Sequence, residues 1–550
     1  MFTLKFFRIM HLQRFTLLAA IAVLTPSSTP ADDASPRLLL LLTIDQGRGD
    51  YLERFEPMLS GGLARILDEA VVFTDAHHDH AGTVTAPGHA SLSTGRHPGN
   101  SGVVGNEFFD RTEGRRVYCV EDDASPVLMP AGARGASPGR SPARLLGTGL
   151  ADWIRAATPS SKVFSVGAKD RSAVLMGAKN ADAAYWFDVN TGQWVSSAYY
   201  MSAYPEWATQ FHRARHIESY FGTTWTPVSV DESLLGRIGI ADGDGPFVHS
   251  LGGDILFPTR SFYNAVFNSP FIESYLLDFA EIVVREESLG ADETVDVLAL
   301  SFASVDTVGH DYGPNSRELL DAIIRLDREL DAFFAFLDEL VGLENIAMSL
   351  SADHGVASFP EHLQAQGLPG ARMSPEDHAC VQRAGRAFEQ EFGDDDWFAH
   401  PLYFDLQTLE RHKVSRERAE AALATELARC PGIAKAWTRT EIEAARSASP
   451  IDPTLALYVH SFHPERSPDI YLQLQEFHID RMRGTTHGSP YSYDTHVIAL
   501  IRWPGMSPKS VPDRVHTVDL PVTLASLLDV EIPEDVDGVN RMDLMPERVE

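Results

Sequence analysis

The segment from Thr83 to Ser91, Thr-Val-Thr-Ala-Pro-Gly-His-Ala-Ser, contains hydroxyl groups that could act as nucleophiles. A strand-like run ends before it and a helix is predicted to start at about Ala90. Thr85 is therefore expected on a tight turn, with its side chain exposed near free backbone N–H donors. A threonine hydroxyl is protonated at neutral pH, and it needs a base or a metal ion to become a strong nucleophile. A catalytic role for this segment therefore requires metal ligands elsewhere in the chain. Without them, Thr83 or Thr85 only caps a helix.

Acidic and imidazole side chains follow three apolar runs, each typical of a strand that is buried on both faces. The runs and the groups after them are 38–44 with Asp45, 295–302 with Asp306 and His310, and 345–350 with Asp353 and His354. In open α/β sheets, ligands gather beyond the carboxyl ends of the strands. Convergence at one edge of a parallel sheet explains all three patterns together.

His487, in a glycine-rich loop, and the hydroxyl of Thr85 join this set. Mixed carboxylate and imidazole ligands with an oxygen nucleophile suit zinc, whereas magnesium prefers oxygen ligands almost alone. The donors are too many for one tetrahedral ion and suit two ions with open positions. Two metal ions about 4 Å apart can hold a bridging phosphate oxygen, one activating the attacking oxygen and the other stabilising the leaving oxygen. The sequence therefore predicts a two-zinc site.

Lys169 and Arg171 follow a strand-like run at 162–166. If the segment is extended, side chains two positions apart point the same way, as a pair that grips one anion must. The alternative is that both are surface salt-bridge partners. Asn106 lies in a short island, 103–110, within a stretch rich in Gly, Pro, Ser and Arg. An amide, an ammonium and a guanidinium together suit the charge of a phosphate monoester dianion.

In this order, these motifs resemble the alkaline phosphatase superfamily, in the branch that uses a threonine nucleophile on a type I phosphodiesterase/nucleotide pyrophosphatase-like fold. The resemblance covers most of residues 38–540. It implies a phosphothreonine at Thr85, which water then hydrolyses. The residues it assigns are Asp306, His310 and His487 for one zinc ion, Asp45, Asp353 and His354 for the other with Thr85 beside it, and Asn106, Lys169 and Arg171 for the phosphate.

The elements that must position these groups alternate between strands and helices, which predicts an α/β fold with a mostly parallel central sheet flanked by helices. Residues 36–360 and 470–545 are expected to form this catalytic domain, with a return to it beginning in a strand at 470–474. Residues 361–469 are expected to form a smaller inserted α+β cap. The aromatic-rich range 185–265 is interpreted as an irregular insertion that forms a wall of the site.

The composition of the 550 residues is that of a globular protein, with 44% hydrophobic and 22% charged residues. A formal charge of −31 argues against nucleic acid or an anionic membrane as a partner, because both require a positive face. An anionic substrate would need local positive charge, which bound divalent cations supply. Small-molecule phosphate monoesters are the expected partners, and the oligomeric state is left open.

The amino terminus, residues 1–31, is interpreted as a cleaved signal peptide, since basic residues precede a short apolar run and small residues follow it. The run is too short to span a bilayer comfortably. Export to the periplasm or the medium, without a membrane anchor after cleavage, is therefore expected. The three cysteines, Cys119, Cys380 and Cys430, allow one disulfide at most. A Cys380–Cys430 bridge suits an oxidising compartment, but the sequence alone does not establish it.

The function predicted from these features is that of a secreted, zinc-dependent alkaline phosphatase with a broad range of monoester substrates. A nucleotide pyrophosphatase or phosphodiesterase of the same superfamily is the alternative, and Lys169 with Arg171 argues against it. A sulfatase is disfavoured because position 85 holds neither Cys nor Ser. A non-catalytic metal-binding surface protein is the alternative from another class. The histidines near position 78 are interpreted as a local polar loop and not as a metal site.

Overall fold

The structure is a computed structural model, and it describes residues 35–130, 138–214, 216–241, 247–253 and 255–547. The predicted signal peptide, residues 1–31, lies outside the described residues. Within the described ranges, no helix combines the length and the apolar character that a membrane span needs.

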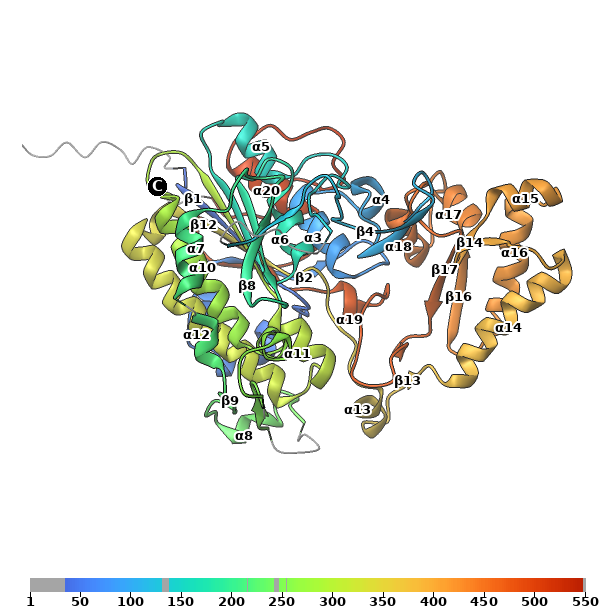
Figure 1. Ribbon diagram of the computed structural model, residues 1–550, viewed down its shortest axis with the longest axis horizontal. Coiled ribbons are helices and arrows are strands. Elements are labelled where there is room, and N and C mark those ends of the chain that lie inside the picture. The colour runs from blue at the N-terminus through green and yellow to red at the C-terminus, as the bar shows by residue number, and fades with distance from the viewer. Residues whose placement is uncertain (1–34, 131–137, 215, 242–246, 254, 548–550) are drawn as a thin grey trace, which may run out of the picture. The chain divides into compact units, whose positions relative to one another are not determined.

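A ten-stranded sheet forms the centre of the fold (Figure 1). Its strands are β1 (Leu38–Ile44), β2 (Val71–His77), β5 (Val127–Leu128), β6 (Val163–Gly167), β7 (Ala183–Asp188), β8 (Gln193–Ser197), β11 (Asp296–Phe302), β12 (Ile346–Ser351), β19 (Ala499–Arg502) and β20 (Lys509–His516). They lie in the order β20-β2-β19-β12-β1-β11-β6-β7-β8-β5. The neighbours from β12 to β7 run parallel, while β19 and β8 are antiparallel to theirs. The predicted α/β class with a mostly parallel sheet is confirmed.

Strand β1 shows why the centre of the sheet forms from these residues. All its side chains are buried, as expected for a parallel strand that is covered on both faces. Alternate residues face opposite sides, so Leu40 and Leu42 join one hydrophobic core while Leu39 and Leu41 join the other. The register pairs Ile44 with Phe302 of β11. The carboxyl ends of β1, β11 and β12 are therefore level.

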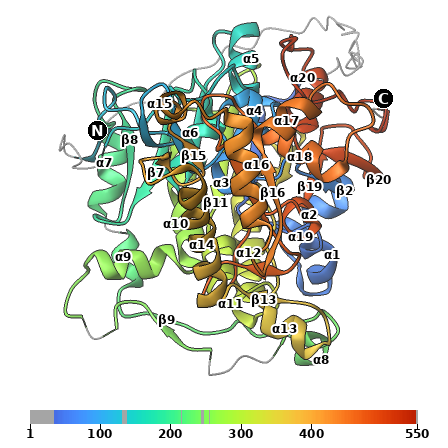
Figure 2. The same ribbon diagram turned by 90° about the vertical axis from the view of Figure 1, so that its right-hand side faces the viewer.

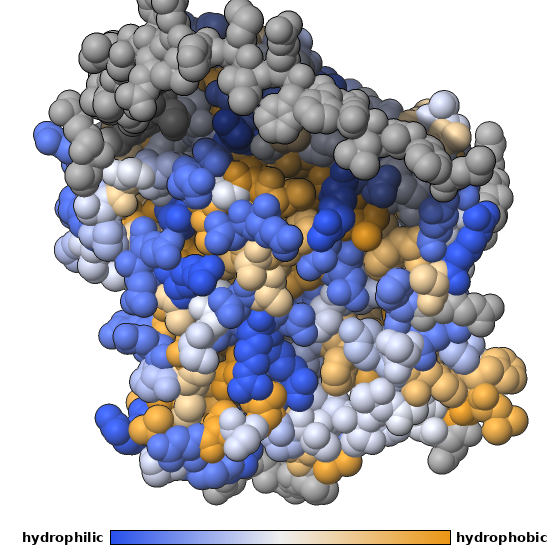
Figure 3. Space-filling view, turned by 90° about the vertical axis from the view of Figure 1, so that its left-hand side faces the viewer, coloured by the Kyte–Doolittle hydropathy of each residue, from blue (hydrophilic) through white to orange (hydrophobic). Residues whose placement is uncertain are grey.

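Helices cover both faces of the sheet. The first core is closed by α2 (Gly62–Glu69), α10 (Phe271–Glu286) and α12 (Arg317–Leu340), and the second by α5 (Leu150–Ala157) and α20 (Asp519–Leu527). The long helix α12 exposes its polar side to solvent, and Figure 3 shows mainly hydrophilic residues with smaller apolar groups on this side of the molecule. An amphipathic helix with one buried stripe behaves in this way.

Shorter elements connect these layers. The helices are α1 (Tyr51–Phe55), α3 (Thr85–Thr94), α4 (Pro98–Ser101), α6 (Asp170–Gly177), α7 (Glu206–Arg213), α8 (Glu232–Leu235), α9 (Arg260–Phe267), α11 (Ser304–Tyr312) and α19 (Ser492–Thr495), with 3₁₀ turns at Glu56–Met58, His216–Tyr220 and Leu343–Asn345. The additional strand pairs are β3 (Glu107–Asp110) with β4 (Arg115–Tyr118) and β9 (Thr224–Trp225) with β10 (His249–Ser250).

Two expectations about this part of the chain are wrong. The range 185–265 is not an irregular insertion throughout, because it begins with β7 and β8 of the main sheet and Trp194 is fully buried in the core. The aromatic rings fill the space between the sheet and α10. The high number of aromatic residues in this range therefore indicated a buried core and not an irregular insertion. Helix α3 also starts at Thr85 and not near Ala90. Pro87 does not delay the start, because proline is tolerated in the first turn of a helix.

Residues 360–479, the inserted segment, are mainly helical and lie in the chain between β12 and β19 (Figure 2). Its elements are α13 (Pro360–Ala365), α14 (Pro375–Phe392), α15 (Leu406–His412), α16 (Arg416–Leu427), α17 (Arg439–Ala445) and α18 (Pro453–Ser461), and the strands β13 (Ala371–Arg372), β14 (Phe398–His400), β15 (Tyr403–Phe404), β16 (Ile433–Thr438), β17 (Ile470–Leu474) and β18 (His478–Ile479). Phe388, Trp397 and Leu423 belong to a separate hydrophobic cluster there. Strand β17 pairs with β16 and does not enter the main sheet. The domain boundaries themselves stay a prediction.

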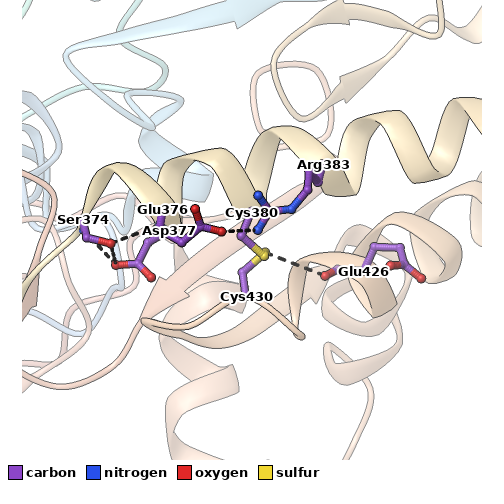
Figure 4. Close-up of a disulfide and its surroundings, with 7 residues drawn as sticks. All are labelled: Ser374, Glu376, Asp377, Cys380, Arg383, Glu426 and Cys430. Atoms are coloured by element: carbon purple, nitrogen blue, oxygen red, sulfur yellow. Dashed lines mark hydrogen bonds and ion pairs between the residues drawn. A yellow bond between two sulfur atoms is a disulfide. The ribbon is translucent and has the colours of Figure 1, made fainter.

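A disulfide joins Cys380 of α14 to Cys430, which follows α16 (Figure 4). It closes a loop of 50 positions inside the inserted segment. Ser374 and Asp377 cap the start of α14 through reciprocal hydrogen bonds. The third cysteine, Cys119, is buried and not part of the bridge.

Candidate two-metal active site

Three carboxylates meet at the carboxyl edge of the sheet. Asp45 directly follows β1, Asp353 follows β12 by two positions, and Asp306 lies in the first turn of α11, just after β11. Each is at most 4% exposed. Lys169 Nζ lies 2.7 Å from Asp45 Oδ2 and 2.5 Å from Asp306 Oδ2. The one ammonium group neutralises only part of this buried negative charge.

The three predicted histidine ligands are oriented by backbone carbonyl groups. The bonds are His310 Nδ1 to Thr485 O at 2.8 Å, His354 Nδ1 to Gly355 O at 3.0 Å, and His487 Nδ1 to Thr83 O at 2.8 Å. Because a carbonyl oxygen only accepts, each Nδ1 carries the proton and each Nε2 has a free lone pair. Metal-binding histidines are commonly held in this way.

Each free Nε2 faces a carboxylate oxygen. His310 Nε2 and His487 Nε2 lie 3.2 and 3.6 Å from Asp306 Oδ1. His354 Nε2 lies 3.5 Å from Asp45 Oδ1 and 3.4 Å from Asp353 Oδ2. Two lone pairs at this separation repel each other unless a cation lies between them. The donor sets Asp45, Asp353, His354 and Asp306, His354, His487 therefore fit metal ions.

Unpaired atoms support the same conclusion. Asp45 Oδ1, Asp353 Oδ2 and His354 Nε2 are buried and have no hydrogen-bond partner among the described residues. A buried polar atom without a partner costs about 1–3 kcal/mol, and more if it is charged. A bound cation removes this cost for all three atoms at once.

The carboxylates differ in their pKa values. Burial, with Asp353 close by, raises the pKa of Asp45 well above its usual value. Burial acts in the same direction on Asp306, but Lys169 and the neighbouring histidines outweigh it and hold the pKa of Asp306 well below its usual value. Burial and the rings of His354 and His310 lower the pKa of His487. His487 is therefore neutral, the form that binds metals.

Thr85 is the first residue of α3 and is only 1% exposed, so the expected exposed side chain is wrong. The helix N-terminus points into the site and not into solvent. Arg171 Nη2 donates to Thr85 Oγ1 at 3.2 Å. The Ala86 N–H donates to Asn106 Oδ1 at 2.8 Å, which leaves the amide nitrogen of Asn106 as the group to offer an anion.

Lys169 and Arg171 are not on an extended segment. Lys169 is the N-cap of α6, and Arg171 lies in its first turn. Their side chains diverge: the lysine contacts the carboxylates and the arginine contacts Thr85. Between them, Asp170 accepts hydrogen bonds from Tyr118 and Arg140. Both cations still reach the site. They do so from the start of a helix and not from alternate positions of a strand.

Two residues of the site were not predicted. His89 Nδ1 lies 3.2 Å from Asp353 Oδ2 and 2.9 Å from Thr85 O. Its position four residues after Thr85 was a usable signal, because both lie on one helix face. Gln46 donates from Nε2 to Asp306 Oδ1 at 2.7 Å and from its backbone N to Asp353 Oδ1 at 3.0 Å. Gln46 has a φ of 67°, and no sequence pattern predicted this left-handed backbone.

A pocket of about 430 Å³ lies beside α6. Its lining includes Lys169 and Arg171 together with the rings of Trp186, Phe187 and Phe267. The end of β7, from the aromatic-rich range, therefore lines a pocket together with Lys169 and Arg171.

The family described as type I phosphodiesterase / nucleotide pyrophosphatase matches residues 39–480. The chain belongs to this family. Its curated relatives include alkaline phosphatase PhoV of Synechococcus elongatus, which is 31% identical over 95% of this chain and 96% of its own. Alkaline phosphatase PafA of Elizabethkingia meningoseptica is 31% identical over 92% and 93% of the two chains.

The crystal structure of wild-type PafA matches this member of the family with a TM-score of 0.83 and 29% identity, over 93% of this chain and 99% of PafA. A PafA variant in which a threonine, an asparagine, a lysine and an arginine are substituted matches with the same TM-score and 28% identity. The predicted resemblance to the alkaline phosphatase superfamily is confirmed.

Proposed function

We propose that this protein is a zinc-dependent alkaline phosphatase that hydrolyses phosphate monoesters through a phosphothreonine at Thr85. One observation carries the proposal: three imidazole lone pairs face buried carboxylates next to a threonine hydroxyl that accepts a hydrogen bond from Arg171. The full-length similarity to alkaline phosphatases PhoV and PafA supports it.

Two zinc ions would be held by Asp306, His310 and His487 and by Asp45, Asp353 and His354, with Thr85 beside the second. When bound, zinc supplies Lewis-acid stabilisation of the attacking and leaving oxygens. Mixed nitrogen and oxygen donors favour zinc over magnesium. Gln46 and the three backbone carbonyl groups keep these ligands in orientation.

Thr85 would attack the phosphorus atom in line with the leaving alcohol. The Arg171 guanidinium, which donates to Oγ1, favours the ionised hydroxyl. The new Oγ–P bond replaces the bond to the alcohol, which leaves with a proton. Water then breaks the Oγ–P bond and restores Thr85, with inorganic phosphate as the second product.

Asn106, Lys169 and Arg171 are proposed to bind the non-bridging oxygens of the phosphoryl group. The substituted residues of the PafA variant have the same types and nearly the same spacing as Thr85 and these three: the threonine and the asparagine are 21 positions apart in both chains, and the lysine and the arginine are 2 apart. A monoester carries one more charged oxygen than a diester, so three polar donors favour the monoester.

A phosphodiesterase remains the second candidate, and the pocket beside α6 is the observation that favours it. Its aromatic wall could receive a second ester group next to Lys169 and Arg171. The charge of these two residues supports the monoesterase, and rates on the two substrate types separate the candidates.

The proposed compartment is the periplasm or the medium. The basic and apolar pattern of residues 1–31 and the Cys380–Cys430 disulfide support it, because disulfides persist in oxidising compartments.

Chelation tests the metal requirement. Purified protein is stripped with a chelator, its zinc and magnesium contents are measured, and initial rates are taken on phenyl phosphate and on the matching diester before and after each metal is restored. We expect the stripped protein to be inactive and zinc to restore the monoester rate better than magnesium. Full activity of a verified metal-free sample would reject the two-zinc mechanism, and a faster diester rate would transfer the assignment to the phosphodiesterase.

A further inference from the structure

A second group of ligand side chains lies outside the candidate active site, where the inserted segment meets the loop that precedes Thr85. Asp79 follows β2, His97 precedes α4, His460 lies near the end of α18, and His516 is the last residue of β20. Ligand atoms of Asp79, His97 and His460 lie within 4.8 Å of one another. Four separate parts of the chain thus bring three imidazoles to one carboxylate.

The spacing of these atoms resembles that of the candidate catalytic ligands. Asp79 Oδ2 is 3.1 Å from His460 Nδ1 and 4.0 Å from His97 Nε2, and Asp79 Oδ1 is 3.9 Å from His516 Nδ1. Ligand atoms about 2.0–2.1 Å from a tetrahedral ion are about 3.3 Å apart. Small side-chain rotations would therefore be enough to reach this geometry.

Several buried histidine ring nitrogens around this group have no hydrogen-bond partner among the described residues. Within the described ranges, His97 Nδ1, His516 Nδ1 and both ring nitrogens of His80 are buried without a hydrogen-bond partner. His97 is 8% exposed and His80 is fully buried. Buried side-chain nitrogens in proteins are nearly always paired, so the unpaired His516 Nδ1, 3.9 Å from Asp79 Oδ1, is a free donor at this carboxylate.

We propose that Asp79, His97 and His460 bind a third divalent transition-metal ion, with zinc as the best fit and His516 as the closest further donor. One carboxylate oxygen with imidazole nitrogens suits zinc and not calcium or magnesium. His460 Nδ1 now donates to the Asp79 carbonyl oxygen at 2.8 Å. A metal ion bound at Nδ1 would replace this hydrogen bond.

A neighbouring group has similar spacing, but both ring nitrogens of its buried histidine have hydrogen-bond partners. Asp75, His77 and His496 are equally close together. Both nitrogens of His77 are already paired, with Asp75 Oδ1 at 2.9 Å and Thr495 Oγ1 at 3.0 Å, and Arg514 lies 3.4 Å from the same Asp75 oxygen. A cation there would have to displace the arginine, so this group serves as an internal control.

The proposed ion would join the inserted segment to the loop of the candidate nucleophile. His460 belongs to α18, which packs on α4 (Figure 1), whereas Asp79 lies six positions before Thr85. Hydrogen bonds already tie this loop to α18, because Ala81 N donates to Leu457 O and Ser461 Oγ. The ion would therefore be structural, and it would not take part in phosphoryl transfer.

Zinc stoichiometry of the full-length protein tests the proposal. Parent, His97→Ala and Asp79→Asn proteins are dialysed against the same zinc buffer, and zinc per chain is measured together with phenyl phosphate hydrolysis and circular dichroism. We expect each folded variant to hold one zinc equivalent less than the parent while it still hydrolyses the monoester. The difference does not depend on whether the active site itself holds two zinc ions.

Two controls sharpen the result. His463→Ala, just beyond α18, and His496→Ala, in the neighbouring group, should keep the zinc content of the parent. Equal zinc in parent and folded His97→Ala protein would overturn the proposal. If the variants do not fold, crystals of the parent measured at the zinc absorption edge decide: an anomalous peak between Asp79, His97 and His460 supports the site, and its absence from fully zinc-loaded crystals rejects it.

Discussion

The carboxyl edge of the main sheet buries its carboxylates together, whereas the inserted segment holds several of its ion pairs at the surface. At the edge, the register of buried strands brings Asp45 and Asp353 together at no more than 1% exposure. In the inserted segment, pairs such as Arg383 with Glu376 stay more than half exposed. Exposed pairs contribute little to stability, whereas grouped buried carboxylates are costly unless a cation joins them. Chemistry is therefore expected from the edge and not from the exposed pairs of the inserted segment.

The largest effect is expected for Thr85→Ala, at the edge. Turnover of phenyl phosphate should fall by several powers of ten because the covalent step has lost its nucleophile, while zinc content and circular dichroism stay close to those of the parent. Thr85→Ser should retain part of the activity. Parent-like turnover of the alanine variant would mean that water is the attacking group.

The next largest effect is expected for the double variant Lys169→Ala with Arg171→Ala. Each charge-assisted contact to a phosphoryl oxygen is worth about 1.5–3 kcal/mol. Monoester kcat/KM should therefore fall far more than diester kcat/KM, measured on matched phenyl esters with zinc content checked. If both rates fell equally, the pair would act only on the general field of the site or on folding.

A smaller effect is expected for Gln46→Ala, because Gln46 orients the proposed ligands Asp306 and Asp353 without being one. Loss of such a partner typically lowers metal affinity about 10–100-fold. Chelator competition should detect this loss, and excess zinc should restore most of the turnover. The matched control is Gln473→Ala, a buried glutamine of the inserted segment that bonds Trp437 and Tyr491. A control with equally weakened zinc binding would contradict the assigned role of Gln46.

The smallest effect on turnover is expected for Cys380→Ser with Cys430→Ser. Loss of a bridge that closes 50 positions should lower local stability by about 2–4 kcal/mol. Limited proteolysis should cut the inserted segment sooner, at unchanged kcat on phenyl phosphate. Reduced parent protein should behave in the same way. A large loss of kcat would show that the segment and the sheet edge are not separable.

Continuous apolar runs made the sheet predictable. The bounds of β1 and of α10 agree with the predicted ranges, and the meeting of Asp45, Asp306 and Asp353 followed from the rule that ligands gather at the carboxyl edge of parallel strands. Strands β7 and β8 were missed because aromatic residues surrounded by Gly, Pro and Ser also suit an irregular loop.

Side-chain direction was less predictable than position. Lys169 and Arg171 were assigned to a common anion by strand alternation, but a helix begins between them and each reaches a different partner. Gln46 was missed because its left-handed backbone is imposed by the turn between β1 and the sheet edge. A positive φ in a non-glycine residue has no local sequence signal, because tertiary contacts and not neighbouring residues stabilise the strained backbone.

The long-range contacts of the candidate site also determine when it can form during synthesis. Gln46 donates to Asp353 across 307 positions, and His487 donates to Thr83 across 404. Contacts between such distant residues form slowly, because long loops must close first. A growing chain carries Asp45 long before His487 exists, so no partial chain holds the complete ligand set. In the proposed two-zinc site, full metal loading would therefore wait until His487 has joined the fold, and an exported chain would take its zinc from the compartment in which its folding ends.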